Sequence, residues 1–152
     1  MFKRTISEKL YQWAAKADRK PLVLRGARQV GKTSVVNLFS ENFDQYVCLN
    51  LDRPEDKALF ENDYPFQSVL DAIFFHKNKE KNVGKTLVFI DEIQNSPRAV
   101  SLLRYFYEDS PELYVIAAGS LLESLIDNQI SFPVGRVEYL ALRPCSFEEL
   151  FL

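Results

Sequence analysis

The sequence has few of the residues and runs that mark secreted or membrane-spanning proteins. Only two of its 152 residues are cysteines, Cys48 and Cys145, and they form no CxxC pair, so we expect buried reduced thiols rather than a disulfide or a metal site. No apolar run approaches the roughly 18 residues that a membrane span requires. The first ten residues, MFKRTISEKL, lack the apolar centre of a secretion signal. We therefore expect a cytoplasmic protein with no membrane partner.

The chain also lacks a charge imbalance. Its 19 basic and 21 acidic residues give a formal net charge of -2, so composition does not indicate a nucleic-acid partner. The single histidine, His76, falls near the end of an expected helix, and we expect it to be solvated and without a role. Hydrophobic residues make up 47% of the chain and charged residues 26%, which is typical of one folded domain.

Apolar runs that alternate with helix signals predict an α/β fold. We expect a leading helix over residues 5–17, started by a capping box from Thr5 to Glu8, and a core over residues 20–145. Predicted strands cover residues 21–25, 45–51, 86–90, 113–118 and 137–142. Predicted helices start after the glycine loop, at Asp52 as N-cap, at Phe66 and at Ser96-Pro97. Strands separated by helices form a mainly parallel sheet with right-handed crossovers.

The last seven residues indicate a longer protein. Ser146 to Glu149 forms another capping box, and Phe147, Leu150 and Phe151 begin an apolar helix face. The sequence stops after little more than one turn, and such a short isolated helix is marginal. We therefore expect residues 1–152 to be a single domain cut from a longer chain; the alternative is a C-terminal helix that simply ends there.

The segment GARQVGKT, residues 26–33, carries the clearest signal of function. It matches G-x-x-x-x-G-K-[ST] in full and lies between a predicted strand and a predicted helix, as this phosphate loop requires. Its glycines let successive backbone N–H groups point at phosphate oxygens, and the helix that follows adds its positive end. The predicted nucleotide-binding residues are Gly26, Ala27, Arg28, Gln29, Val30, Gly31, Lys32, Thr33 and Ser34.

Three residues of this loop have distinct expected roles. Lys32 reaches the β- and γ-phosphates, and the Thr33 hydroxyl is a ligand of Mg²⁺. We expect Arg28 to pack over the loop or to pair with a nearby residue, without a part in the chemistry. A second GKT, residues 84–86, has Lys79 where the motif needs its first glycine, and it precedes a strand instead of a helix. We predict a turn there, with no chemistry.

Residues 87–92, LVFIDE, place two carboxylates directly after four apolar residues. Such an apolar run is typical of a strand buried on both faces, and ligands bind at the carboxyl ends of such strands. Asp91 is positioned to hold Mg²⁺ through water, next to Thr33. Glu92 is positioned to polarise the water that attacks the γ-phosphate. Solvated loop carboxylates are the alternative, which the phosphate loop argues against.

The carboxylate pair favours hydrolysis among the reactions of phosphate-loop proteins. A GTPase carries DxxG and NKxD, but here Asp91 is followed by Glu-Ile-Gln, and residues 78–81 read NKEK. A small-molecule kinase usually needs an arginine-rich lid, which we do not identify. We therefore expect an ATPase that acts on the γ-phosphate, with weak turnover in this shortened form. A regulatory switch with negligible turnover and a small-molecule kinase stay open as alternatives.

Two further residues fit catalytic roles less specifically. Ser120 follows the fourth predicted strand, where a hydroxyl can report on the γ-phosphate, but with Glu123 it also forms a capping box. Arg136 precedes the last predicted strand. It fits either a surface ion pair or a positive charge for the transition state, supplied in the same chain or to a neighbouring subunit. The predicted catalytic set is Lys32, Glu92, Ser120 and Arg136.

These motifs together resemble the ATPase domain of a family of archaeal and bacterial AAA+-like P-loop ATPases. The matching segments are RGARQVGKTSVV, YVCLNLD, LVFIDEIQ, VIAAGSLLESL and VGRVEYLALRPCSFEELF, which span nearly the whole chain. The resemblance implies a P-loop sheet of order 5-1-4-3-2, with ATP and Mg²⁺ as ligands and the residues above in their stated roles. It also implies a C-terminal domain of unknown function and is compatible with a homo-oligomer.

Overall fold

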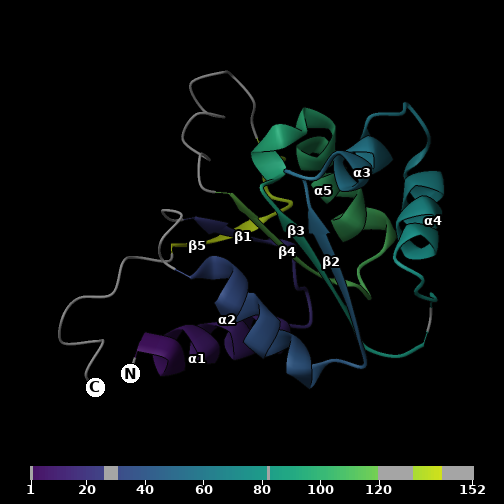
Figure 1. The fold of residues 1–152 in the computed structure, drawn as a ribbon. Coiled ribbons are helices and arrows are strands. Elements are labelled where there is room, and N and C mark those ends of the chain that lie inside the picture. The colour runs from purple at the N-terminus through teal and green to yellow at the C-terminus, as the bar shows by residue number, and fades with distance from the viewer. Residues whose placement is uncertain (1, 26–30, 82, 120–131, 142–152) are drawn as a thin grey trace.

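Helices and strands alternate along the chain, as the apolar runs predict. The computed structural model describes residues 2–25, 31–81, 83–119 and 132–141 (Figure 1). The helices are α1 (Phe2–Ala14), α2 (Lys32–Phe39), α3 (Pro54–Lys57), α4 (Phe66–His76) and α5 (Pro97–Asp109). The strands are β1 (Leu22–Arg25), β2 (Gln45–Asn50), β3 (Thr86–Asp91), β4 (Tyr114–Gly119) and β5 (Glu138–Ala141). Short 3-10 turns are η2 (Ser40–Asn42), η3 (Ala58–Phe60) and η4 (Ile93–Asn95).

The five described strands form one parallel sheet in the order β2-β3-β4-β1-β5. This is the predicted order 5-1-4-3-2 read from the other edge, so the expected α/β P-loop fold is confirmed. The strands agree with the predicted ranges to within two residues at each end. Because all five run the same way, their carboxyl ends meet at one edge of the sheet, where the phosphate loop follows β1.

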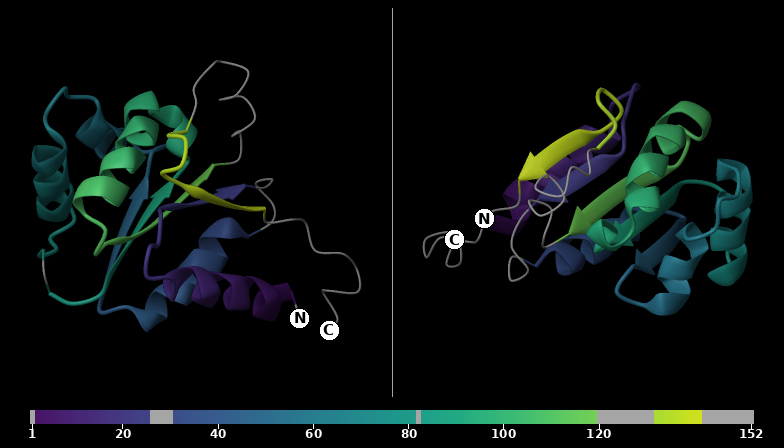
Figure 2. Two further views of the ribbon diagram at one scale, coloured as in Figure 1. Left: turned by 180° about the vertical axis from the view of Figure 1, so that it is seen from behind. Right: turned by 90° about the horizontal axis from the view of Figure 1, so that it is seen from above.

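Helices cover both faces of the sheet because the central strands are apolar on both sides (Figures 1 and 2). In β3, Leu87 and Phe89 face α1 and α2, whereas Val88 and Ile90 face α4 and α5. All four side chains are fully buried. The strand that carries Asp91 is therefore held rigidly between two apolar layers. No helix within the described residues has both the length and the apolar character that crossing a membrane requires.

Two of the predicted helix starts are wrong. The leading helix begins at Phe2 and not at Thr5, so the proposed capping box falls inside the helix. At α3 the N-cap is Arg53 instead of Asp52, whose side chain accepts a hydrogen bond from Asn95 Nδ2 at 2.7 Å. Ser96 does cap α5, because its hydroxyl accepts from the backbone N–H of Ala99 at 3.1 Å. The capping boxes predicted at Ser120 and Ser146 lie outside the described residues.

The second GKT forms a turn into β3, as predicted. Gly84 has a φ of +118°, and a Cβ at this position would lie 2.5 Å from Asp44 Oδ2, so the site requires glycine. Asp44 Oδ2 accepts a hydrogen bond from the backbone N–H of Lys85 at 2.8 Å. Thr86 is buried and begins β3, at the edge of the sheet opposite Asp91.

Of the two cysteines, only Cys48 lies within the described residues. It is half-buried with a free thiol, and burial raises the pKa of this thiol. The side chain is less deeply buried than predicted. Cys145 falls outside the described residues.

Candidate nucleotide-binding site

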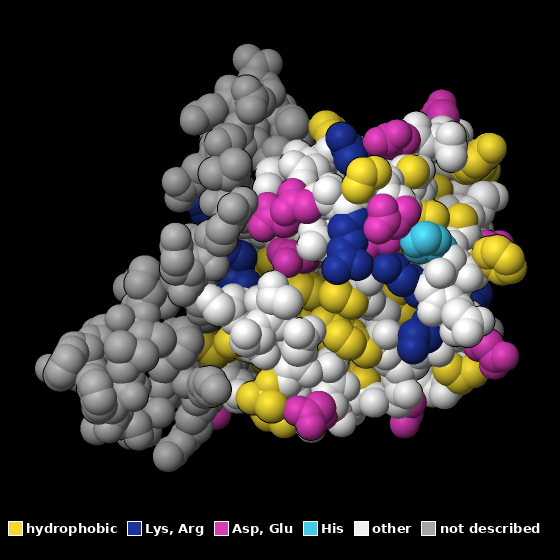
Figure 3. Space-filling model, in the orientation of Figure 1, with side chains coloured by type: hydrophobic (Ala, Val, Ile, Leu, Met, Phe, Trp, Pro, Cys, Tyr) yellow, Lys and Arg dark blue, Asp and Glu magenta, His cyan; other side chains and the backbone are white. Residues whose placement is uncertain are grey.

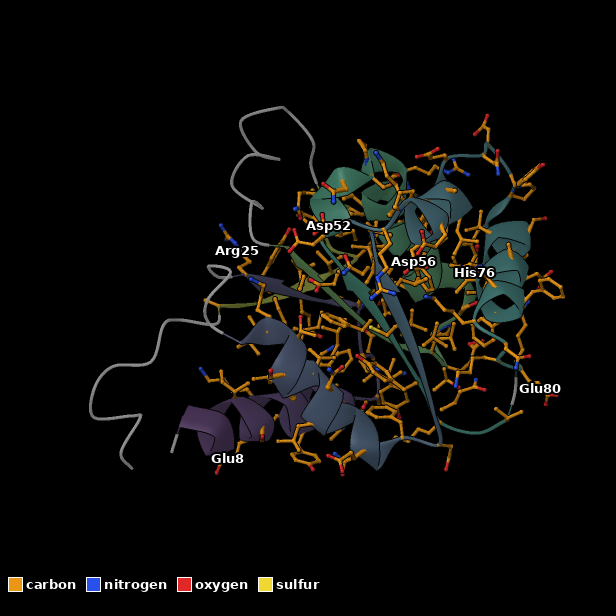
Figure 4. The ribbon with its side chains drawn as sticks, in the orientation of Figure 1. Glu8, Arg25, Asp52, Asp56, His76 and Glu80 are labelled. Carbon is orange, nitrogen blue, oxygen red and sulfur yellow. The ribbon has the colours of Figure 1, made fainter. Side chains whose placement is uncertain are left out.

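An open cavity of about 430 Å³ lies where β2 and β3 end and α2 begins. The start of α2 forms one wall, and the residues that end or follow β2 and β3 form the other, as Figure 4 shows for Asp52. Ligands bind at this edge in parallel α/β sheets, so the position itself indicates a binding site. The described residues that line the cavity are Gly31, Lys32, Thr33, Ser34, Asn50, Asp52, Asp91 and Glu92.

The start of α2 brings two sources of positive charge to this cavity. Gly31 is the N-cap, with φ 77° and ψ 31°, a left-handed conformation that glycine adopts without strain. Lys32 is the first helical residue, and only 5% of its surface is exposed. A buried ammonium at the positive end of a helix is unfavourable unless anions lie nearby, and the Asp91 carboxylate is close enough to interact with it. The arrangement is suited to a phosphate group.

Asp91 connects the end of β3 to α2. Its Oδ2 accepts a hydrogen bond from Thr33 Oγ1 at 3.0 Å, and its Oδ1 accepts from the backbone N–H of Glu92 at 2.9 Å. Burial raises the pKa of the Asp91 carboxyl, and these two hydrogen bonds oppose the rise without cancelling it. The structure therefore brings together Thr33 and Asp91, the two residues predicted to hold Mg²⁺.

The oxygen donors at this position fit a magnesium ion. Mg²⁺ prefers hard oxygen ligands at about 2.1 Å in an octahedron, in which neighbouring ligands lie about 3 Å apart. The 3.0 Å hydrogen bond from Thr33 Oγ1 to Asp91 Oδ2 uses the hydroxyl proton, so a lone pair of Oγ1 could still face the ion, with Asp91 placed to hold it through water. The described residues contain no group of three or more His, Cys, Asp or Glu side chains able to hold a metal by themselves. Magnesium at this site would therefore depend on phosphate oxygens and water for its other ligands.

Glu92 lies in the same cavity in an unusual backbone conformation. Its φ is 54° and its ψ is 45°, the left-handed region that non-glycine residues rarely adopt, and its side chain is 8% exposed. Strained residues of this kind persist where the surrounding structure fixes them, and they cluster at functional sites. The carboxylate accepts a hydrogen bond from Gln94 Nε2 at 2.6 Å.

Two residues that line the cavity were not predicted from the sequence. Asn50 ends β2 beside Asp91, its partner in the sheet register, and Asp52 follows two residues later. The side chain of Asn50 accepts a hydrogen bond from the backbone N–H of Asp52 at 3.0 Å. One signal was available in the sequence, because Asn50 and Asp52 lie at the carboxyl end of a predicted parallel strand or directly after it.

The structure separates Arg136 from Lys32 and Glu92. Arg136 lies before the first residue of β5, at the amino edge of the sheet, whereas the cavity is at the carboxyl edge. Its Nε donates to Glu108 Oε1 at 2.9 Å in an exposed ion pair. A role for Arg136 in its own chain does not agree with this position, while a role toward a neighbouring subunit stays a prediction. The predicted residues Gly26, Ala27, Arg28, Gln29, Val30 and Ser120 lie outside the described residues.

A buried carboxylate supports the wall formed by β2. Asp56 in α3 is 1% exposed, and its Oδ2 accepts from the backbone N–H of Asn50 at 2.9 Å. Lys77 Nζ and His76 Nε2 lie 2.9 Å and 3.3 Å from its Oδ1. Figure 4 shows Asp56 and His76 approaching from α3 and α4, and Figure 3 shows acidic, basic and histidine side chains side by side on this face. His76 is exposed, as expected, but its imidazole also lies against the Asp56 carboxylate, a contact that was not predicted.

Burial raises the pKa of Asp56, but the Asn50 N–H, Lys77 and His76 together lower it by more, so the carboxyl titrates below its ordinary value. Asp56 therefore adds stability that is fully present above its unfolded-state pKa and is lost as the pH falls through the folded-state pKa. We expect Asp56→Asn to lower the free energy of unfolding by about 1–3 kcal/mol at pH 7, with a smaller difference from the unmodified protein below about pH 4.

Urea unfolding across this pH range measures the effect of Asp56→Asn. The matched control is Asp63→Asn, because Asp63 pairs with Arg98 at 3.3 Å but has a fully exposed side chain. We expect the control to change the free energy of unfolding by less than about 0.5 kcal/mol. Equal losses in the two variants would show that burial of Asp56 does not strengthen its interactions.

Comparison with known proteins assigns the chain to a family. A family model described as an AAA domain matches residues 18–151, which is most of the chain. The chain belongs to the AAA domain family. A search of curated proteins found no match to this AAA domain.

Solved structures share the fold of this AAA domain at low sequence identity. A Walker-type ATPase of Pyrococcus abyssi superposes with a TM-score of 0.57 at 18% identity, over 94% of this chain and 53% of that one. The ORC1 protein of Aeropyrum pernix, solved in complex with DNA, gives a TM-score of 0.56 at 15% identity, over 99% and 46% of the two chains. The chain thus spans about half the length of these structures.

Proposed function

We propose that this AAA domain binds ATP with Mg²⁺ and hydrolyses the γ-phosphate. The observation that carries the proposal is a single cavity in which Glu92 lies next to the Thr33–Asp91 pair and opposite the start of α2. Binding alone needs the helix start and Lys32, whereas hydrolysis also needs a base beside the phosphate. Membership of the AAA family and the fold shared with a Walker-type ATPase support the same reaction.

The described residues divide into three roles in this mechanism. Lys32 and the N–H groups at the start of α2 bind the phosphates and offset their charge. Thr33 and Asp91 would hold Mg²⁺, which supplies further positive charge to the phosphate oxygens. Glu92 accepts a proton from the attacking water as the new O–P bond forms and the bond between the β- and γ-phosphates breaks, releasing ADP and phosphate. Roles for residues 26–30, Ser120 and Arg136 stay predictions.

Phosphate release from ATP, measured with purified protein, tests the proposal. We expect turnover with ATP and Mg²⁺ that exceeds the rate of a Glu92→Gln variant measured in parallel. If ATP binds but the unmodified protein releases no phosphate above the rate measured without protein, the domain is a nucleotide-dependent switch. If label from ATP moves to an acceptor in a metabolite mixture and not to water, the domain is a small-molecule kinase. Either result would overturn the hydrolase assignment.

Turnover is expected to depend on magnesium through Thr33. Chelation of divalent ions should abolish phosphate release, and Thr33→Val should raise the Mg²⁺ concentration for half-maximal activity about tenfold, because the variant loses one oxygen ligand. Magnesium titration of the rate measures both effects. Ser101→Ala is the control, since Ser101 is an exposed residue of α5 whose hydroxyl bonds to the carbonyl of Arg98. An unchanged magnesium requirement in Thr33→Val would exclude Thr33 as a ligand.

A further inference from the structure

The turn after β3 contains a side-chain contact that the mechanism above does not use. Gln94 Nε2 donates a hydrogen bond to Glu92 Oε2 at 2.6 Å. A hydrogen bond to an ionised carboxylate is about twice as strong as one between neutral groups. The amide also carries no charge that would compete with a nucleotide phosphate. Gln94 is therefore suited to hold the Glu92 carboxylate in one orientation.

The backbone that carries Gln94 is anchored on both sides. Within η4, the backbone N–H of Asn95 donates to the carbonyl of Glu92 at 3.1 Å. The side-chain amide of Asn95 donates to the Leu51 carbonyl at 3.1 Å and to Asp52 Oδ1 at 2.7 Å, which ties the turn to the end of β2. Gln94 thus acts on Glu92 from a fixed position.

The other end of the Gln94 amide shows that this contact has a cost. Its Oε1 is buried and has no hydrogen-bond partner among the described residues. A buried polar atom without a partner is unfavourable. Turning the amide over would place Oε1 against the carboxylate and remove the hydrogen bond to Glu92. The hydrogen bond to Glu92 therefore exists in only one of the two orientations of the amide.

We propose that Gln94 is a positioning residue that fixes the carboxylate of Glu92 for its role as base. The inference rests on the proposed function, since Glu92 must be the base for its orientation to affect turnover. Reacting groups lose rate steeply when they are displaced by about 1 Å, and Glu92 already has a backbone conformation that needs support from its surroundings. Gln94 affects the chemical step and not the binding of ATP.

Steady-state kinetics of Gln94→Leu and Gln94→Glu test this role. We expect kcat to fall about tenfold or more in Gln94→Leu, with KM for ATP and the melting temperature nearly unchanged. Gln94→Glu keeps the shape but places a second acceptor against Glu92, so its kcat should fall at least as far. Gln67→Leu makes the same change at an exposed position of α4 near the opposite edge of the sheet and should leave kcat unchanged. Normal kcat in Gln94→Glu would overturn the proposal, because a side chain of this shape would then support turnover without donating a hydrogen bond to Glu92.

A double-mutant cycle shows whether Gln94 acts through Glu92. In a Glu92→Gln background, measured at high protein concentration, adding Gln94→Leu should lower kcat no further. Additive losses would overturn the positioning role, and so would a rise in kcat in Gln94→Leu, which would mean that the contact restrains the base. Absence of turnover in the unmodified protein would overturn the proposed function and this inference together. Normal turnover with unaffected Gln94 variants would overturn the inference alone.

Discussion

Replacing Lys32 with alanine is expected to abolish measurable ATP binding. The side chain is 5% exposed and follows Gly31 at the start of α2, so its ammonium and the positive end of the helix act on the same cavity. A γ-phosphate bound there would lose its main cationic partner. Truncating one partner of a buried charge pair costs about 2–5 kcal/mol, which corresponds to a rise in Kd of about 30- to 5,000-fold.

Calorimetric titration with ATP and Mg²⁺ measures this loss. Lys32→Met keeps much of the apolar stem and should lose nearly as much affinity, because the charge and not the packing holds the phosphate. The second GKT supplies the matched control. Lys85 is exposed at the opposite edge of the sheet, with its Nζ 5.1 Å from the centre of the Phe43 ring, so Lys85→Ala should leave Kd unchanged. Near-normal affinity for ATP in Lys32→Ala would contradict the assignment of residues 26–33 as a phosphate loop.

Glu92→Gln is expected to stop turnover while ATP still binds. An amide of the same shape cannot accept the proton of the attacking water, and loss of a general base lowers rates by about 100- to 10,000-fold. The carbonyl oxygen of the new side chain can still accept a hydrogen bond from Gln94, so we expect the geometry of the turn to be kept. Kd for ATP should change by less than about threefold, because the phosphates are bound mainly from α2.

Single-turnover phosphate release and ATP titration, run on the same protein preparation, separate the two effects. Glu61→Gln is the control, since Glu61 is 58% exposed and pairs with Lys57 at 4.0 Å on the surface. Its kcat should equal that of the unmodified protein. If Glu92→Gln keeps full turnover, another group accepts the proton, and Glu92 has a structural role.

The features that the sequence predicted well depend on local pattern. The apolar run before Asp91 has two buried faces, and only a strand inside a sheet covered on both sides accommodates it. The start of α5 at Ser96-Pro97 was also predictable, because the capping residue and the first turn of the helix are neighbours in the chain. Placement of Asp91 next to Thr33 followed from the parallel direction of the strands.

The features that were missed depend on contacts between distant parts of the chain. His76 meets Asp56 across two helices, and nothing near His76 in the sequence indicates a carboxylate. The contact between Gln94 and Glu92 needs the left-handed backbone at Glu92, which is unusual for glutamate. Arg136 is a different case, because a residue before a parallel strand lies at the amino edge of the sheet, so its distance from the cavity was predictable.

The pairing of β1 has a consequence for when the cavity can form. Leu22 in β1 pairs with Ile116 in β4 and with Glu138 in β5, both far later in the chain, whereas β2 pairs with the next strand, β3. Contacts between such distant residues form slowly, because a long loop must close first. During synthesis the strand that leads into the phosphate loop has no neighbour until β4 has left the ribosome. The start of α2, which follows β1, is therefore joined to the cavity wall formed by β2 and β3 only late in folding.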